Sequence, residues 1–263
     1  VLTDINNTSG LYDFVQACEK NNIKALAGIE FRKNNKLLYI GIARSNYGFH
    51  ELCAFLSNIN VFNNELPERA PALNQTFFIY PWPNSFSSLR DDEFIGVYPW
   101  LINKFLAKTV NLNQDKFVAL MPVVIQNDED FLTHKLLRAI DENTLLSKLE
   151  ENQNCHPQSY FIPRKQLIKY FERAVFLLHN AQKLIDSCDF SPDFKSLKNR
   201  KTFTRSSSDD KILLEKLARE GLTYRYGNKN KEAIKRLNNE LEVIFNLGFA
   251  PYFLITWDII RYA

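Results

Sequence analysis

The pattern of apolar and polar positions over the first thirty residues predicts a strand, a helix and a second strand. Apolar residues recur at helical spacing from Leu11 to Cys18 and define one apolar face. Thr8 or Ser9 can cap this helix, because a side-chain oxygen there accepts an unpaired backbone N–H. Ala25–Ile29 follows as the next strand. Two parallel strands joined by a helix bring their carboxyl ends to one edge of a sheet, where α/β proteins build their sites.

Two carboxylates lie at the ends of these strands and are candidate site residues. Asp4 ends the first strand and Glu30 follows the second, so we expect both at the same edge of the sheet. A metal or catalytic role is one interpretation. The other is structural, because Asp in a Thr-Asp-x-Asn-Asn turn often only accepts hydrogen bonds from nearby backbone N–H groups. The spacing alone leaves both interpretations open.

Strands and helices alternate from the N-terminus to about residue 125. This predicts a parallel, right-handed α/β arrangement, either open or closed into a barrel. Lys33–Lys36 separates two apolar runs and is typical of a hairpin tip. From Asp130 the pattern becomes mostly helical, and one helix is expected from about Arg164 to Cys188.

The C-terminal part of the chain predicts a junction and three short helices. Asp189–Ser208 is polar and basic and reads as the junction. The first helix, Lys211–Glu220, should end at Gly221. The second, Lys231–Leu247, should end at the glycine after it. The third, Tyr252–Ala263, is apolar nearly all round and is expected to be buried, with its packing partner beyond the end of the chain.

Composition narrows the function classes only slightly. The chain has 263 residues and 45% hydrophobic residues, enough for a substantial core, and its net charge of +3 is too mild to indicate nucleic acid by itself. No two of the four cysteines have the C-x-x-C spacing of a zinc or redox site, so a reduced, cytoplasmic setting is expected. No apolar run reaches the roughly 20 residues that a membrane helix needs.

Basic side chains gather in the predicted junction and are candidates for contacts with nucleic-acid phosphates. The candidates for nucleic-acid binding are Lys198, Arg200, Lys201 and Arg205, next to Lys195. A solvated linker is the favoured interpretation, because runs of charge are more often solvated than bound.

The chain resembles the α subunit of bacterial DNA polymerase III. The resemblance is carried near the C-terminus by LLEKLAREGLTYRYG and RLNNELEVIFNLGFAPYFLITWDIIRYA. Near the N-terminus, LTDINNTSGLYDFVQACEKNNIKALAGIEF is similar to the second and third motifs of that family's PHP (polymerase and histidinol phosphatase) domain. NYGFHELCAFLS and THKLLRAI match further segments. The matches follow the family's order over most of the chain and are weakest over about Asn58–Lys116.

The resemblance implies an α/β fold with two parts. Residues 1–190 would form an incomplete PHP-type (β/α)7 barrel that lacks its N-terminal part. Residues 191–263 would form a linker and the small helical segment that leads into the polymerase palm. The polymerase carboxylates of the family follow this segment, so no catalytic residue is assigned here and the fragment itself is not expected to polymerise DNA.

The resemblance also implies a metal site, but few of the family's ligand positions hold a matching residue in this chain. The PHP fold of the family holds up to three metal ions with His, Asp and Glu ligands. Asp4 and Glu30 match two of these positions, whereas Ile5 stands where the family has a histidine. The family's first motif would precede Val1, and its Asn-Asp-x-His loop lacks the histidine, which leaves Asp128 as a distant third ligand. We expect a vestigial site that binds Mg²⁺ or Mn²⁺ weakly or not at all, while the full polymerase would use Mg²⁺.

Three functions are compatible with these observations. The first is the N-terminal region of a replicative polymerase subunit with a scaffolding barrel, whose partners in the whole enzyme are DNA, the sliding clamp, the clamp loader and a proofreading exonuclease, with no membrane. The second is an active metal-dependent PHP phosphoesterase, either a 3′–5′ exonuclease or a pyrophosphatase, which would need the missing histidines. The third is a free-standing phosphatase of the histidinol phosphatase type, which the palm-linker resemblance disfavours.

Overall fold

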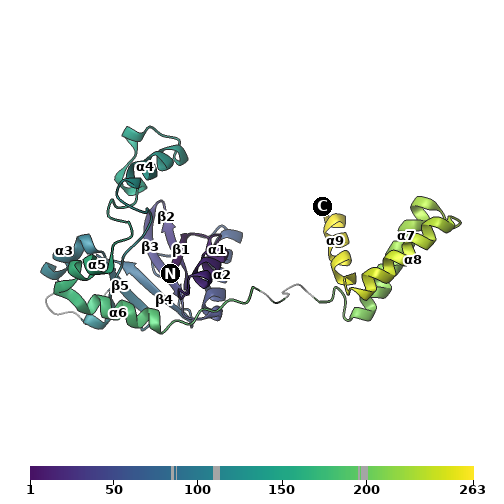
Figure 1. Ribbon diagram of the computed structural model, residues 1–263, viewed down its shortest axis with the longest axis horizontal. Coiled ribbons are helices and arrows are strands. Elements are labelled where there is room, and N and C mark those ends of the chain that lie inside the picture. Colours follow the sequence, from purple (N-terminus) through teal and green to yellow (C-terminus); the bar gives the residue numbers. More distant parts are fainter. Residues whose placement is uncertain (84–85, 87, 109–112, 195, 197–200) are drawn as a thin grey trace. The chain divides into compact units, whose positions relative to one another are not determined.

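The computed structural model describes residues 1–83, 86, 88–108, 113–194, 196 and 201–263, and the statements below concern this described part of the chain. It divides into two compact units, Val1–Pro192 and Asp193–Ala263 (Figure 1). We call them unit 1 and unit 2. Unit 1 holds all of the strands, and unit 2 is helical.

Unit 1 is built on a six-stranded sheet whose strands lie side by side in chain order. The strands are β1 (Leu2–Ile5), β2 (Ala27–Lys33), β3 (Lys36–Ala43), β4 (Thr76–Pro81), β5 (Glu93–Val97) and β6 (Phe117–Ala119). β1 and β2 are parallel, β3 is antiparallel to both of its neighbours, and β4, β5 and β6 are parallel. All strands except β3 therefore run in one direction, and their carboxyl ends share one edge of the sheet.

The hairpin expected at Lys33–Lys36 is confirmed. Lys33 pairs with Lys36 across the turn, and Asn34 and Asn35 at its tip have φ angles of 48° and 63°. Two successive positive φ angles form a tight turn whose twist matches that of a β-hairpin, and Asn tolerates this conformation better than most residues. This turn is the reason that β3 runs against the other strands.

The predicted α/β class is confirmed in its coarse form, because strands and helices are interspersed along unit 1. The predicted parallel arrangement is wrong for β3, which is antiparallel to both of its neighbours, and no described helix separates β2 from β3 or β4 from β5. The described strand pairings end at β1 on one side of the sheet and at β6 on the other. A barrel closed through these two strands is not among the described pairings, so the incomplete barrel stays a prediction.

The helices of unit 1 follow the predicted order with one correction. They are α1 (Leu11–Lys20), α2 (Asn46–Val61), α3 (Ile102–Lys108), α4 (Asp130–Asp141), α5 (Arg164–Tyr170) and α6 (Val175–Asp186). The single helix expected from about Arg164 to Cys188 is wrong, because a 3-10 turn at Glu172–Ala174 separates α5 from α6. Phe171 and Ala174 at this break are buried in the core. Tertiary packing of these two side chains overrides the helical periodicity.

Two clusters of buried side chains hold unit 1 together. The first joins β2, β3 and β4 to α1 and α2, with Phe31, Tyr39 and Phe78 among its members. The second joins β5 and β6 to α3 and α6, with Phe105 and Leu177 at its centre. Buried aromatic side chains of this size dominate core energetics. The clusters fix the sheet that carries the candidate site residues.

Unit 2 consists of three described helices, α7 (Ser207–Tyr226), α8 (Lys231–Asn246) and α9 (Ala250–Tyr262). The predicted end of the first helix at Gly221 is wrong, because α7 continues through Gly221 and is followed by Gly227, whose φ angle is +71°. The predicted end of the second helix is confirmed, because Gly248 follows α8 with a φ angle of +72°. Glycine adopts such angles without the steric cost that other residues meet.

The expectation that the last helix is buried against a partner beyond Ala263 stays a prediction, because the structure shows only the packing within the described residues. Leu254 is fully buried, whereas Tyr252, Ile259 and Ile260 of α9 are more than 60% exposed. Only one side of α9 therefore packs within the described chain. No single described helix is long and apolar enough to cross a membrane, and α8 and α9 meet the length and composition criteria only as a pair that is bent by 113°.

Candidate functional site

The two candidate carboxylates lie close to the carboxyl end of β1, but on opposite faces of the sheet. The expectation that Glu30 follows its strand is wrong, because β2 continues to Lys33 and Glu30 lies in its middle. The register pairs Asp4 with Ile29 and Ile5 with Glu30. Paired residues on neighbouring strands point to the same face, and successive residues alternate between faces. Asp4 and Glu30 are offset by one residue in this register. The structure therefore does not bring them together as ligands of one ion.

Asp4 holds the turn between β1 and α1. Its Oδ2 accepts a hydrogen bond from the backbone N–H of Gly10 at 2.8 Å. The predicted cap by Thr8 or Ser9 is wrong, because neither side chain bonds the first turn of α1. The carboxylate of Asp4 instead satisfies the backbone donor that precedes the helix. This contact matches the structural interpretation of Asp4.

Glu30 is engaged by a cation from its own strand. Its carboxylate forms an ion pair with Arg32, which lies two residues along β2 and therefore on the same face. Only 14% of the Glu30 side chain is exposed. The backbone of Arg32 is fixed in turn by Asn6, whose side chain accepts its N–H at 3.0 Å and donates to its carbonyl at 2.9 Å. The guanidinium group of Arg32 thus already supplies the positive charge that a metal ion beside Glu30 would supply.

Tyr98 lies directly after β5 and belongs to the same region. Burial and then the negative charge of Glu30 raise the pKa of Tyr98 to about 12. The ring of Tyr98 stacks on Trp100 at 4.7 Å between ring centroids, and Trp100 stacks on His156 at 3.8 Å. Burial lowers the pKa of His156, so this imidazole is neutral at pH 7 and packs as an aromatic ring.

A second histidine of this region is also committed to structure. Nε2 of His134 on α4 accepts the backbone N–H of Cys155 at 3.0 Å. Burial and the nearby charge of Arg138 lower the pKa of His134. The hydrogen bond ties α4 to the segment that carries His156, and it uses the nitrogen lone pair that a metal would need.

The residues of this region do not fit the metal centre that the resemblance implies. Ile5, the partner of Glu30 in the register, has no ligand atom. Asp128, the third candidate, is exposed. In the described part of the chain, no group of three or more His, Cys, Asp or Glu side chains is placed to hold a metal ion. This region instead contains the carboxylate of Glu30, neutralised by Arg32, and the stacked rings of Tyr98, Trp100 and His156.

Sequence reasoning overlooked Arg32 and Tyr98. Arg32 could have been found from its spacing, because opposite charges two residues apart on a strand lie on one face. Tyr98 could not, because its closeness to Glu30 depends on how β2 and β5 are arranged within the sheet.

The predicted nucleic-acid-binding residues are only partly described. Lys198 and Arg200 lie outside the described residues. Lys201 and Arg205 are exposed, and neither forms an ion pair with another described residue. The segment between them is anchored to α7, because the buried carboxylate of Asp210 accepts the backbone N–H groups of Phe203 and Thr204 at 2.9 and 2.6 Å.

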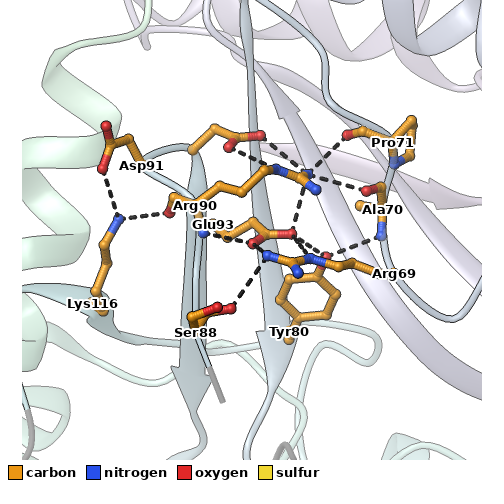
Figure 2. A network of polar contacts seen from close by, with 10 residues as sticks. Arg69, Ala70, Pro71, Tyr80, Ser88, Arg90, Asp91, Glu93 and Lys116 are labelled. Atoms are coloured by element: carbon orange, nitrogen blue, oxygen red, sulfur yellow. Dashed lines mark hydrogen bonds and ion pairs between the residues drawn. The ribbon is translucent and has the colours of Figure 1, made fainter. Parts of the chain in front are cut away.

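A network of polar contacts surrounds the buried carboxylate of Glu93, the first residue of β5 (Figure 2). Arg69 donates two hydrogen bonds to its carboxylate, at 2.9 and 2.5 Å. The hydroxyl of Tyr80 and the backbone N–H of Arg90 each donate one more, both at 2.8 Å. Burial opposes ionisation of Glu93, but these hydrogen bonds outweigh it and lower the pKa of Glu93 to about 2.

The position of this network indicates a structural role. Glu93 lies at the amino end of β5, at the edge opposite to Tyr98. Arg90 also donates to the carbonyls of Ala70 and Pro71, at 3.1 and 3.0 Å, so the network fastens the segment before β4 to the start of β5. Sites in sheets of parallel strands form at the carboxyl ends, whereas the amino ends serve stability.

Comparison with known proteins defines the class. The model of the family "Bacterial DNA polymerase III alpha NTPase domain" matches residues 212–263, within unit 2. A DNA polymerase III subunit alpha of Halalkalibacterium halodurans is 27% identical over 303 residues, which cover all of this chain and 26% of that relative. The subunit of the same name from Mycoplasma genitalium is 27% identical over 276 residues, which cover 98% of this chain and 30% of the relative. An error-prone DNA polymerase of Symbiobacterium thermophilum is 26% identical over 149 residues, or 54% of this chain and 14% of that relative.

These matches place the chain among relatives of bacterial DNA polymerases. Within that class they confirm the resemblance to the DNA polymerase III α subunit, and the resemblance extends over the whole chain. The chain spans between a quarter and a third of the length of these two α subunits.

Proposed function

We propose that the chain is the N-terminal region of a replicative DNA polymerase III α subunit, in which unit 1 is an incomplete PHP-type barrel that acts as a scaffold. One observation carries the scaffolding role. The carboxylate of Glu30 is neutralised by Arg32, and its cross-strand partner is Ile5. An ion pair within the protein replaces the cluster of ligands that metal-dependent hydrolysis would need.

In the whole protein this region would contribute to DNA synthesis during replication. Its partners there would be DNA, the sliding clamp, the clamp loader and a proofreading exonuclease. No polymerase catalytic residue is assigned within this chain, which spans 26% and 30% of the two related α subunits. Mg²⁺ would be required by the full polymerase and by no group described in unit 1.

Manganese binding and hydrolysis test the scaffolding role. The purified chain is equilibrated with Mn²⁺, bound metal is measured by electron paramagnetic resonance, and nucleotide release from a primer 3′ end is measured alongside. We expect neither stoichiometric metal nor release. Stoichiometric Mn²⁺ and hydrolysis that are both lost in Glu30→Gln, but kept in the exposed control Asp13→Asn, would overturn the scaffold and indicate an active exonuclease or pyrophosphatase.

A gain-of-binding variant tests whether Arg32 and Ile5 keep a metal ion from binding at Glu30. Ile5→His with Arg32→Ala supplies an imidazole opposite Glu30 and removes the competing cation. We expect this double variant to bind Mn²⁺ more tightly than the unchanged chain, and Glu30→Gln in its background should reverse the gain. Unchanged binding would mean that Arg32 and Ile5 are not what keeps metal out.

A further inference from the structure

Helix α5 and the turn after it form a strongly basic exposed surface of unit 1. The stretch Arg164–Arg173 carries four basic side chains and one acidic side chain, so its net charge of +3 equals that of the whole chain. The basic residues are Arg164, Lys165, Lys169 and Arg173. All four are exposed. We call this surface the α5 face.

The charges of the α5 face have no partner among the described residues. None of the four basic side chains forms an ion pair or a side-chain hydrogen bond there, whereas exposed arginines on other helices do. Arg219 pairs with Glu215 at 2.7 Å, and Arg236 pairs with Glu240 at 2.9 Å. Like charges four residues apart on a helix repel each other, as Lys165 and Lys169 do. The α5 face therefore lowers the stability of the fold, and its charges are available to an anion.

The opposite side of α5 is used by the core. Leu167 and Tyr170 pack against the cluster that also holds Phe105 of α3, at the end of unit 1 where α3, α5 and α6 gather (Figure 1). This packing fixes the orientation of the helix, so its basic residues face solvent. Two apolar side chains accompany them, because Phe161 just before α5 is 73% exposed and Ile168 is 48% exposed.

We propose that the α5 face binds single-stranded nucleic acid. Lys and Arg neutralise phosphates without reading sequence, and an exposed aromatic ring such as Phe161 offers a surface on which an unpaired base stacks. A duplex fits this surface less well, because its bases are stacked on one another inside the helix and are not free to stack on Phe161. A membrane surface would need the apolar side of α5, which the core occupies. The proposal does not rest on the scaffolding role of unit 1.

Salt-dependent binding tests the electrostatic part. Affinity of the whole chain for a fluorescent oligothymidylate of about 16 nucleotides is measured by anisotropy at several salt concentrations. Four phosphate contacts on a single strand predict a slope of log affinity against log salt of about −2.8, or a fall of about 50-fold between roughly 50 and 200 mM salt. Lys165→Gln with Lys169→Gln should reduce this slope by about 1.4.

Two further variants distinguish binding at the α5 face from a general effect of the net positive charge. Lys20→Gln with Lys148→Gln removes the same charge from exposed positions elsewhere in unit 1 and should leave the slope unchanged. Phe161→Ala should weaken binding about 5-fold or more at every salt concentration without changing the slope, because stacking involves no counterion release.

Three outcomes would overturn the proposal. The first is equal weakening by the two double-lysine variants, which would show that only net charge matters. The second is full affinity in Phe161→Ala, which would remove the stacked base. The third is tighter binding of polyglutamate or of phosphatidylserine vesicles than of oligothymidylate at the same salt, which would assign the α5 face to an acidic polypeptide or to a lipid surface.

Discussion

At the scale of single residues, two glutamates of unit 1 are each neutralised by arginine, one within β2 and one at the start of β5. Glu30 pairs with Arg32 where a metal site was expected. Glu93 is fully buried and is held by Arg69, Tyr80 and the backbone of Arg90. A buried carboxylate is tolerated only when its hydrogen bonds are satisfied. Glu93 meets this condition and should therefore matter for stability.

Replacing Glu93 with glutamine should destabilise unit 1. The variant leaves two guanidinium groups without their carboxylate, because Arg90 as well as Arg69 forms an ion pair with Glu93, at 3.1 Å. We expect the free energy of unfolding at pH 7 to fall by about 3 kcal/mol. The pKa of Glu93 is about 2 in the folded protein, below its ordinary value of 4.5. Its contribution is therefore complete above pH 4.5 and is lost as the pH falls toward 2, and the variant should lack this pH dependence. Urea unfolding at a series of pH values measures both effects.

An exposed ion pair provides the control for this measurement. Glu65 pairs with Lys33 at 2.6 Å, but 83% of its side chain is exposed. Glu65→Gln should leave stability nearly unchanged, because exposed pairs contribute little. Equal stability of Glu93→Gln and Glu65→Gln would contradict the importance of burial for Glu93.

The sequence predicted the position of one of the two candidate carboxylates but not what either of them does. Asp4 could be placed near the end of its strand from the pattern alone, whereas Glu30 lies in the middle of β2, which continues to Lys33. Their faces depend on the register of β1 against β2, and a shift of one residue changes the face of every side chain. The stack of Tyr98, Trp100 and His156 joins segments that are distant in the sequence, and no local pattern predicts it.

At the scale of elements, the two glycines that the sequence predicted as helix ends behave differently. Gly248 ends α8 at a positive φ angle, whereas Gly221 lies within α7. Both follow amphipathic runs, so the pattern could not distinguish them. The distinction depends on whether the chain turns there, and tertiary packing decides that.

The same substitution should therefore have opposite effects at these two glycines. An added Cβ meets no atom within 4 Å at either position. Gly221→Ala should stabilise unit 2 by up to about 1 kcal/mol, because alanine favours the helix interior. Gly248→Ala should destabilise it by about 1–2 kcal/mol, because alanine is strained at positive φ. Thermal unfolding followed by circular dichroism measures both, and shifts of the same sign would contradict the helix boundaries.

At the scale of the whole molecule, the chain consists of two units, each with its own buried side chains. Leu241, Ala250 and Leu254 are buried in unit 2, apart from the two clusters of unit 1. Compact units with separate cores commonly unfold in separate steps. We therefore expect two unfolding transitions.

Fluorescence can assign these transitions. In a Trp257→Phe variant the remaining tryptophans, Trp82 and Trp100, report on unit 1 alone, whereas circular dichroism reports on the helices of both units. Adding Glu93→Gln should shift the fluorescence transition and leave the second dichroism step in place. A single transition, coincident in both signals and shifted as a whole, would show that the units unfold together.

The order of the strands has a consequence for how the protein forms during its synthesis. Every pair of neighbours in the sheet joins strands that are consecutive in the chain. A strand that emerges from the ribosome therefore finds its partner already made, and only the connection between the two strands has to close, which is a tight turn between β2 and β3 and includes a helix between β3 and β4. Chains fold N-terminal segments first as they are made. The sheet can thus grow one strand at a time from β1 to β6, and at each stage the next strand pairs with the most recently added one.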